Sequence, residues 1–254
     1  MSAKMFTGVA AAAIALTVGS SAFAGLTTPS FLMTWDASLD ASDPFAYDPG
    51  DFGDVIDQGL GTFQYLGSLS GSTYDVDWDV SVNDDTFGGL TGGDGPFINA
   101  AITVTNNSDE FQSFSLLMTL GGVSPIGPSS LMAGSVGATV TNNQVDGDAT
   151  LRAGAGGSVY SGLIDLASVA TLWDDPYSLV ATGPFATASD DTSFGDPVKV
   201  PGPAVTDSIS ILLEFELSPR DSASVSGTFS VVPGPGALSL LAVFGLAGRR
   251  RRRA

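Results

Sequence analysis

The stretch TYDVDWDVSV, residues 73–82, alternates apolar and polar side chains with a period of two. Because successive side chains of a β-strand point to opposite faces of a sheet, this pattern predicts a strand with one buried face and one exposed face. The apolar side chains are Tyr74, Val76, Trp78, Val80 and Val82. The exposed face carries three carboxylates, those of Asp75, Asp77 and Asp79.

Similar alternation predicts further strands on both sides of this one. They cover residues 31–35, 62–69, 97–105, 111–120, 135–141, 149–153, 158–166, 178–181, 209–217 and 223–232. Residues 40–54, rich in Asp, Gly and Pro, are expected to form a long surface loop. No segment keeps a helical period, and no internal repeat is strong enough to indicate two domains. The sequence therefore predicts an all-β fold, an antiparallel β-sandwich, with a jelly roll as one arrangement of it.

The N-terminus has the three regions of a secretory signal peptide. Lys4 gives the positive charge, residues 9–18 are apolar, and Ala22-Phe23-Ala24 is an A-x-A cleavage site. We expect a cleaved signal helix over residues 1–24, with the mature chain beginning at Gly25. An uncleaved membrane anchor is the alternative.

The C-terminus also has three parts, in a fixed order. A joint of Pro233, Gly234, Pro235 and Gly236 precedes the uncharged apolar residues 237–248, and five arginines follow, Arg249, Arg250, Arg251, Arg252 and Arg253. As a helix, the apolar run would rise about 18 Å, which is short for a hydrocarbon core of roughly 30 Å. We therefore expect a short transmembrane-like helix, with the arginines acting as a membrane stop on the cytoplasmic side and the body outside.

This order of parts resembles the PEP-CTERM sorting signal of exported bacterial proteins, in which a Pro-x-Pro joint, a short apolar helix and an Arg cluster follow one another. Here Gly234 stands where the family's triplet has glutamate. The resemblance implies processing by an exosortase-type sorting enzyme, after export through the translocon and cleavage by signal peptidase. It also implies transient anchoring in the inner membrane and residence in the cell envelope, at the cell surface or in the extracellular matrix. A plain C-terminal tail anchor is the alternative.

The chain thus divides into a signal peptide (1–24), a β-sandwich body (25–232) and a sorting tail (233–254). All 27 acidic residues lie in the body, where Arg152, Lys199 and Arg220 are the only cations, so its formal charge is −24. This charge excludes non-specific nucleic-acid binding, because phosphates would be repelled. The lack of Cys and His excludes Cys-His and Ser-His-Asp catalysis and the common zinc sites.

Calcium is the cofactor that such an acidic body suggests. Asp75 and Asp77 could share an ion with Asp84 or Asp85, and Asp146 and Asp148 could supply oxygens in NNQVDGDAT. Alternate residues of a strand lie about 6.6 to 7 Å apart, too far for three neighbouring carboxylates of β-strand spacing to hold one ion. The alternatives are a solvated acidic face and an ordinary Asp-Gly hairpin turn.

We expect no catalysis. Glu214 and Glu216 could act as a glycosidase pair, but their strand pattern points both outward. Four aromatic side chains could stack on sugars: Trp35, Tyr47, Tyr65 and Trp173. The first hypothesis is a structural or interaction protein of the cell surface or matrix. A calcium-dependent, lectin-like module that binds extracellular polysaccharide is the second, and a glycoside hydrolase is the third.

Overall fold

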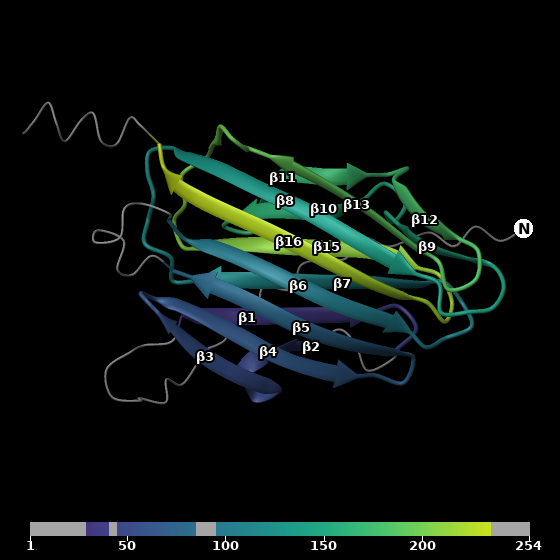
Figure 1. Cartoon of the computed structure of the whole chain (residues 1–254). Coiled ribbons are helices and arrows are strands. Elements are labelled where there is room, and N and C mark those ends of the chain that lie inside the picture. Colours follow the sequence, from purple (N-terminus) through teal and green to yellow (C-terminus); the bar gives the residue numbers. More distant parts are fainter. Residues whose placement is uncertain (1–28, 41–44, 85–94, 235–254) are drawn as a thin grey trace, which may run out of the picture.

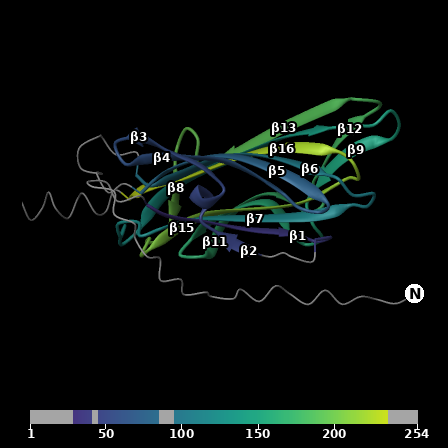
Figure 2. The ribbon, with the colours of Figure 1, turned by 90° about the horizontal axis from the view of Figure 1, so that it is seen from below.

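The computed structural model describes residues 29–40, 45–84 and 95–234, which form two antiparallel sheets packed face to face (Figures 1 and 2). The strand that began the sequence analysis is β5 (Tyr74–Asn83), and its side chains alternate between buried and exposed as predicted. The all-β, sandwich-like architecture is therefore confirmed.

Sheet A has the strand order β11-β10-β15-β7-β1-β2, with β9 pairing β15 and β12 pairing β9. Its strands are β1 (Ser30–Ala37), β2 (Phe45–Tyr47), β7 (Gln112–Gly121), β9 (Asp148–Arg152), β10 (Ser158–Ile164), β11 (Ala167–Asp174), β12 (Ser178–Thr182) and β15 (Ser208–Leu217).

Sheet B has the order β13-β8-β16-β6-β5-β4-β3, with β14 pairing β8. Its strands are β3 (Gly53–Gly59), β4 (Thr62–Ser70), β5, β6 (Phe97–Asn106), β8 (Ser130–Thr141), β13 (Thr187–Phe194), β14 (Val200–Gly202) and β16 (Ser222–Pro233). Two eight-stranded sheets, with β3 to β6 as a consecutive meander, exceed the eight strands of a jelly roll.

The core fills the space between the inner faces of the two sheets. Trp35 of sheet A packs on Tyr74 of sheet B, with ring centroids 5.3 Å apart, and on Phe114 at 5.6 Å. Tyr160 reaches across the core, and its hydroxyl donates to the carbonyl of Thr228 at 2.7 Å. A polar tip that is satisfied in this way lets a large aromatic ring lie fully buried.

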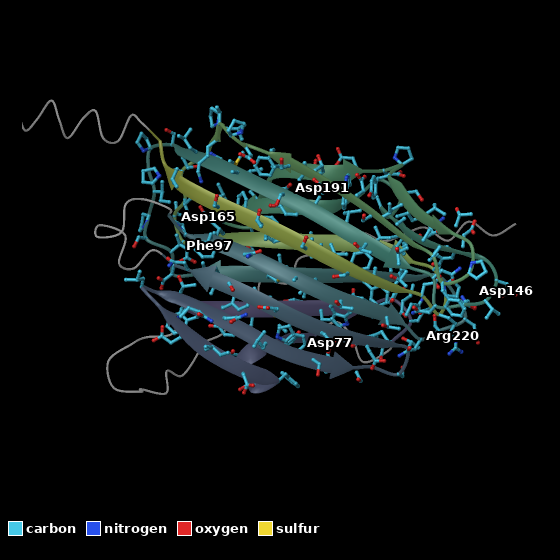
Figure 3. All side chains as sticks on the ribbon, viewed as in Figure 1. Asp77, Phe97, Asp146, Asp165, Asp191 and Arg220 are labelled. Atoms are coloured by element: carbon cyan, nitrogen blue, oxygen red, sulfur yellow. The ribbon has the colours of Figure 1, made fainter. Side chains whose placement is uncertain are left out.

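The two ends of the sandwich carry different loops. The end at which β16 finishes, called here the tail end, carries the connections 59–61, 122–129, 165–166 and 195–207. The opposite end, called the hairpin end, carries 71–73, 107–111, 142–147, 183–186 and the β15–β16 hairpin at 218–221. Figure 3 shows Asp165 and Phe97 toward the tail end, and Asp146 and Arg220 at the hairpin end.

Several strands lie where the sequence predicted none. The expected loop 40–54 contains β2 and a single 3-10 turn, η1 (Pro49–Asp51), and β3 begins at its end. The edge strands β11 and β13 were also missed. An edge strand such as β13, TASDDTSF, is held by backbone pairing with β8 and buries little, so its sequence lacks the apolar alternation.

Both predicted terminal helices, over residues 1–24 and 237–248, lie outside the described residues. Within the described ranges, no helix has the length and apolar character needed to cross a membrane.

Candidate functional site

A short sequence repeat ends two strands of sheet B. The sequence TVTNN occurs at residues 103–107, where β6 ends, and again at 139–143, where β8 ends. These two strands pair with β16 on its two sides, and Thr105 and Thr141 both lie opposite Ser222. Each copy therefore places an asparagine beside the β15–β16 hairpin.

Asn106, in the first copy, is completely buried. Its Nδ2 donates to the carbonyls of Leu217 and Ser218, at 3.0 and 3.1 Å, and to that of Glu110 at 2.9 Å. Its Oδ1 accepts from the backbone N–H of Ser108 at 2.9 Å. One side chain thus satisfies the buried carbonyls of Leu217 and Ser218 and a partly buried carbonyl of another loop.

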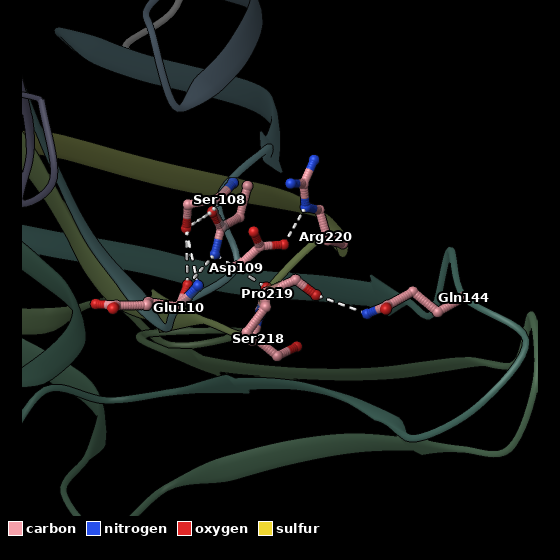
Figure 4. Close-up of polar contacts among 8 residues, drawn as sticks. Ser108, Asp109, Glu110, Gln144, Ser218, Pro219 and Arg220 are labelled. Carbon is pink, nitrogen blue, oxygen red and sulfur yellow. Dashed lines mark hydrogen bonds and ion pairs between the residues drawn. The ribbon is translucent and has the colours of Figure 1, made fainter.

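Asn142 repeats this geometry in the second copy. Its Nδ2 donates to the carbonyls of Gly147 and Gly183, both at 2.9 Å, and its Oδ1 accepts from the N–H of Gln144 at 2.8 Å. Gln144 in turn donates to the carbonyl of Pro219 at 2.8 Å, as Figure 4 shows. Both asparagines therefore accept from the N–H two residues later while bridging loops.

A buried carboxylate joins the two halves of this network. Asp221, 1 % exposed, accepts from the Ser218 hydroxyl at 2.5 Å and from the N–H of Asn143 at 3.1 Å. We call Asn106, Asn142, Ser218 and Asp221 the polar clamp. Figure 4 also shows Arg220 reaching Asp109, a 2.8 Å ion pair that is largely exposed and so adds little stability.

The outer face of sheet B is a second feature of the surface. Because side chains alternate, every outward position of β16 up to Ser230 is a hydroxyl, and the neighbouring strands add more. We call this the hydroxyl face: Thr103, Thr105, Ser135, Thr139, Thr141, Thr187, Ser189, Ser193, Ser222, Ser224, Ser226, Thr228 and Ser230. One row in register runs Ser189, Thr139, Ser224, Thr103, Asp77.

The predicted acidic strand borders this face. Asp75 accepts from the Ser70 hydroxyl and, at 2.7 Å, from Asn107 Nδ2, and these hydrogen bonds lower the pKa of its carboxyl. Asp79 accepts from Gln64 Nε2 at 2.7 Å. Asp77 is exposed between them. The strand thus presents a solvated row of three carboxylates, of which Asp75 and Asp79 are hydrogen-bonded to neutral side chains.

The second predicted calcium site, Asp146 and Asp148, lies at the hairpin end. Both side chains are exposed, and Asp148 accepts from the N–H of Gly183 at 3.0 Å, which ties the start of β9 to the β12–β13 turn. Asp84 is half-buried after β5, whereas Asp85 lies outside the described residues. Over the described ranges, no three acidic side chains gather closely enough to hold a metal ion.

The sorting joint is described only at its beginning. Pro233 is the last residue of β16, opposite Ser130, and the N–H of Gly234 donates to the Ser129 carbonyl at 3.1 Å. Pro233, the first residue of the joint and predicted to lie outside the body (25–232), therefore belongs to the last strand of the body. Since β6 pairs β16 only as far as Ser230, the missing N–H of Pro233 faces an open edge and breaks no ladder bond.

Gly234 lies close against the start of β8. A Cβ at this position would come within 2.8 Å of Ser129 Oγ and 3.1 Å of Ser129 O. The remaining processing and membrane residues fall outside the described residues: Ala22, Ala24, Gly25, Pro235, Gly236, Arg249, Arg250, Arg251, Arg252 and Arg253.

Three of the four aromatics considered for sugar stacking belong to the core. Trp35, Tyr47 and Tyr65 are all buried. Trp173, the fourth, is half-buried and stacks on Tyr177, with ring centroids 4.4 Å apart and planes 7° from parallel. Its ring is therefore already stacked within the protein.

The two glutamates of β15 point outward, as their pattern predicts. Glu216 forms a 2.7 Å ion pair with Arg152, and burial raises the pKa of Glu214 although Ser115 hydrogen-bonds to it. A glycosidase needs one free carboxylate opposite another. Because these two lie side by side on one strand and one is already paired with an arginine, their geometry does not match that requirement.

Asp165 holds a loop at the tail end. Its two carboxylate oxygens accept from the N–H groups of Thr206, Asp207 and Ser208 and from the Thr206 hydroxyl, at 2.7–3.0 Å. Burial alone would raise the pKa of this carboxyl, but these hydrogen bonds outweigh it and lower the pKa. Sequence reasoning missed both this residue and the clamp, although the TVTNN repeat was a visible signal.

A scan against protein-family models gives no match, and a search of curated proteins gives none either.

Replacing either clamp asparagine with alanine should strongly destabilise the fold. Asn106→Ala leaves the buried carbonyls of Leu217 and Ser218 without donors, and Asn142→Ala removes a buried amide that holds two partly buried loop carbonyls, so we expect a loss of about 2–4 kcal/mol in the free energy of unfolding. Asn143→Ala is the matched control, because its side chain is exposed. Urea titration of the three variants measures the difference. Equal stability of all three would contradict the structural role of the clamp.

Asp165→Asn should destabilise the protein in a pH-dependent way. Asparagine tolerates the positive φ of 50° at this position but cannot accept all four hydrogen bonds. Because the folded-state pKa is lowered, the contribution of Asp165 is present above the unfolded pKa of about 3.9 and is lost as pH falls through the folded value. We expect a loss of about 1–2 kcal/mol at pH 7, after allowing for partial exposure, that shrinks below about pH 4.

Urea titrations of the Asp165→Asn variant at pH 7 and pH 3 test this expectation. Asp207→Asn is the control, since it removes a nearby charge whose side chain is exposed. A difference from wild type that stays constant across this pH range would contradict the role assigned to the carboxylate.

Proposed function

We propose that this chain is an exported protein of the bacterial cell surface or extracellular matrix, with a structural or interaction role and no catalysis. Its C-terminus acts as a PEP-CTERM-like sorting signal that an exosortase-type enzyme processes. The signal peptide, the transmembrane-like helix and transient inner-membrane anchoring are parts of this proposal. The translocon and signal peptidase are its partners during export.

The observation that carries the proposal is the junction between the body and the tail. β16 is an inner strand of sheet B, and it runs without a linker to Pro233 and the sheet-bound Gly234. Every strand that the structure describes therefore lies before the tail. This organisation suits an appended sorting segment, because its removal would leave all of these strands in place.

The surface of the body supports an interaction role. The hydroxyl face offers rows of short side chains across five strands, about 4.8 Å apart from one strand to the next. Because its side chains are short, such a face can approach a flat polar partner closely. Its hydrogen-bonding groups are distributed over the whole face and do not converge on one point. A spread arrangement favours adhesion to a repeating surface over turnover of one substrate.

The intact mass of the protein isolated from its native host tests the sorting proposal. We expect a species that begins at Gly25 and ends in or just after the joint, because both end segments would be removed during export. Mass spectrometry of envelope and medium fractions measures it. A mass that retains Arg253 would mean a permanent anchor, and one that retains Met1 would exclude signal cleavage.

Replacing the five arginines with glutamine provides the matching variant. Without its cationic stop, the tail should slip through the membrane, so the mass and location of the product should change. An unchanged product would contradict the role assigned to the cluster.

Binding of extracellular polysaccharide is a second candidate function, favoured by the hydroxyl face. We propose that this binding needs no calcium, because hydroxyls rather than the carboxylates make the contacts. Thr103→Val and Thr139→Val remove hydroxyls from one row with little change of shape, and they should reduce retention in a gel that contains neutral glucan. Thr34→Val, on the outer face of sheet A, is the control. Equal retention of all variants, or loss of retention on adding EDTA, would contradict it.

A further inference from the structure

Three of the most exposed apolar side chains lie on separate loops at the tail end. Leu60 is 72 % exposed in the β3–β4 turn, Leu166 is 59 % exposed in the β10–β11 turn, and Val198 is 77 % exposed before β14. None of the three contributes to the core. Single exposed apolar side chains are common, and Val145 and Phe185 are similarly exposed at the hairpin end, so the position of these three loops relative to the tail decides their meaning.

The strand register places these loops beside the point where the tail leaves the sheet. Ser230 of β16 pairs with Phe97 of β6, Phe97 pairs with Asn83 of β5, and Asn83 pairs with Thr62 of β4. Leu60 precedes Thr62 by two residues, so it lies at the same end of the sheet. On the other side of β16, Val200 and Val231 both pair with Met132, so Val198 also lies at this end. Figure 3 shows Asp165, the neighbour of Leu166, toward the same end.

The length of chain beyond the sheet limits how far this end can lie from the bilayer. Gly234 is held on Ser129, and the apolar run begins at Ala237, three residues later. Three extended residues span at most about 10 Å. If the run enters a bilayer, the end of β16 must lie within that distance of it.

We propose that the tail end of the sandwich rests on the surface of the lipid bilayer, with Leu60, Leu166 and Val198 in its interfacial layer. This inference depends on the membrane anchoring proposed above. The short connection brings the three loops to the bilayer, and their apolar side chains then gain burial there. Lys199, which follows Val198 and donates to the Ser230 hydroxyl, places the body's one lysine at the same surface.

Acidic residues at this end determine which lipid headgroups the loops can contact and how deeply the loops enter the bilayer. The side chains of Asp196 and Asp207 are exposed on the same loops. Anionic headgroups would repel them, so the contact is shallow and stronger on zwitterionic phosphatidylcholine than on anionic lipid. The occupant of this surface is therefore a neutral headgroup layer.

The absence of cysteine from the chain allows a direct test with single-cysteine variants. Leu60→Cys and Val198→Cys carry an environment-sensitive fluorophore, and the full chain is reconstituted in phosphatidylcholine nanodiscs. We expect a blue shift and a rise in emission at both sites, relative to the same variants in water. Val145→Cys and Phe185→Cys are matched controls, because these side chains are 70 % and 64 % exposed at the hairpin end. They should keep water-like spectra.

A probe in the tail separates this inference from the function on which it rests. If Leu241→Cys reports lipid while positions 60 and 198 stay water-like, the surface contact is overturned and the anchoring stands. If position 241 also stays water-like, both fail. A 20-residue Gly/Ser linker before Ala237 should allow the body to separate by roughly 25 Å. Positions 60 and 198 should then become water-like while position 241 still reports lipid, and unchanged spectra would mean that the short connection is not the cause.

Discussion

The hydrogen bonding of β16 on both of its sides is the constraint on which the rest of this structure depends. β16 pairs with β8 along its whole length and with β6 as far as Ser230. Its inward residues Val225 and Phe229 are fully buried, while its outward residues form the centre of the hydroxyl face. At the start of β16, the polar clamp supplies hydrogen-bond partners to backbone groups of the β15–β16 hairpin. This fixes one register for a strand whose outward face has only small polar side chains.

Hydrogen bonds from backbone N–H groups also explain how so acidic a body maintains irregular loops although its sequence has no cysteine. Loop carboxylates such as Asp148, Asp165 and Asp221 accept from backbone N–H groups, as helix caps and turns do elsewhere. The N–H dipoles of these groups stabilise the carboxylate charges. Two of the carboxylates considered for calcium, those of Asp75 and Asp148, likewise accept hydrogen bonds from the protein itself.

Sequence patterns predicted the strands that bury a face and missed those that do not. Val76, Trp78 and Val80 revealed β5 because each is nearly inaccessible, and the outward direction of Glu214 followed from the same rule. β13 gave no such signal, since it depends on the unpaired edge of β8. The clamp was predictable in part, because TVTNN occurs twice. The contact between this repeat and residues 218–221 depends on pairing between strands more than 75 residues apart in the sequence. No local sequence pattern encodes such pairing.

The position of Gly234 links the folding of the body to the chemistry of its last residues. Proteins commonly recognise an extended peptide by pairing it with a sheet as an added β-strand. Here the same backbone already serves as the final rung of β8, and a larger residue at 234 would push against Ser129. Glycine at 234 therefore lets the chain stay hydrogen-bonded beside the start of β8 one residue beyond β16. If the proposed sorting enzyme acts at this joint, it competes with the protein's own sheet for one segment. The stability of the Gly234–Ser129 hydrogen bond then sets how often that segment is free to bind the enzyme.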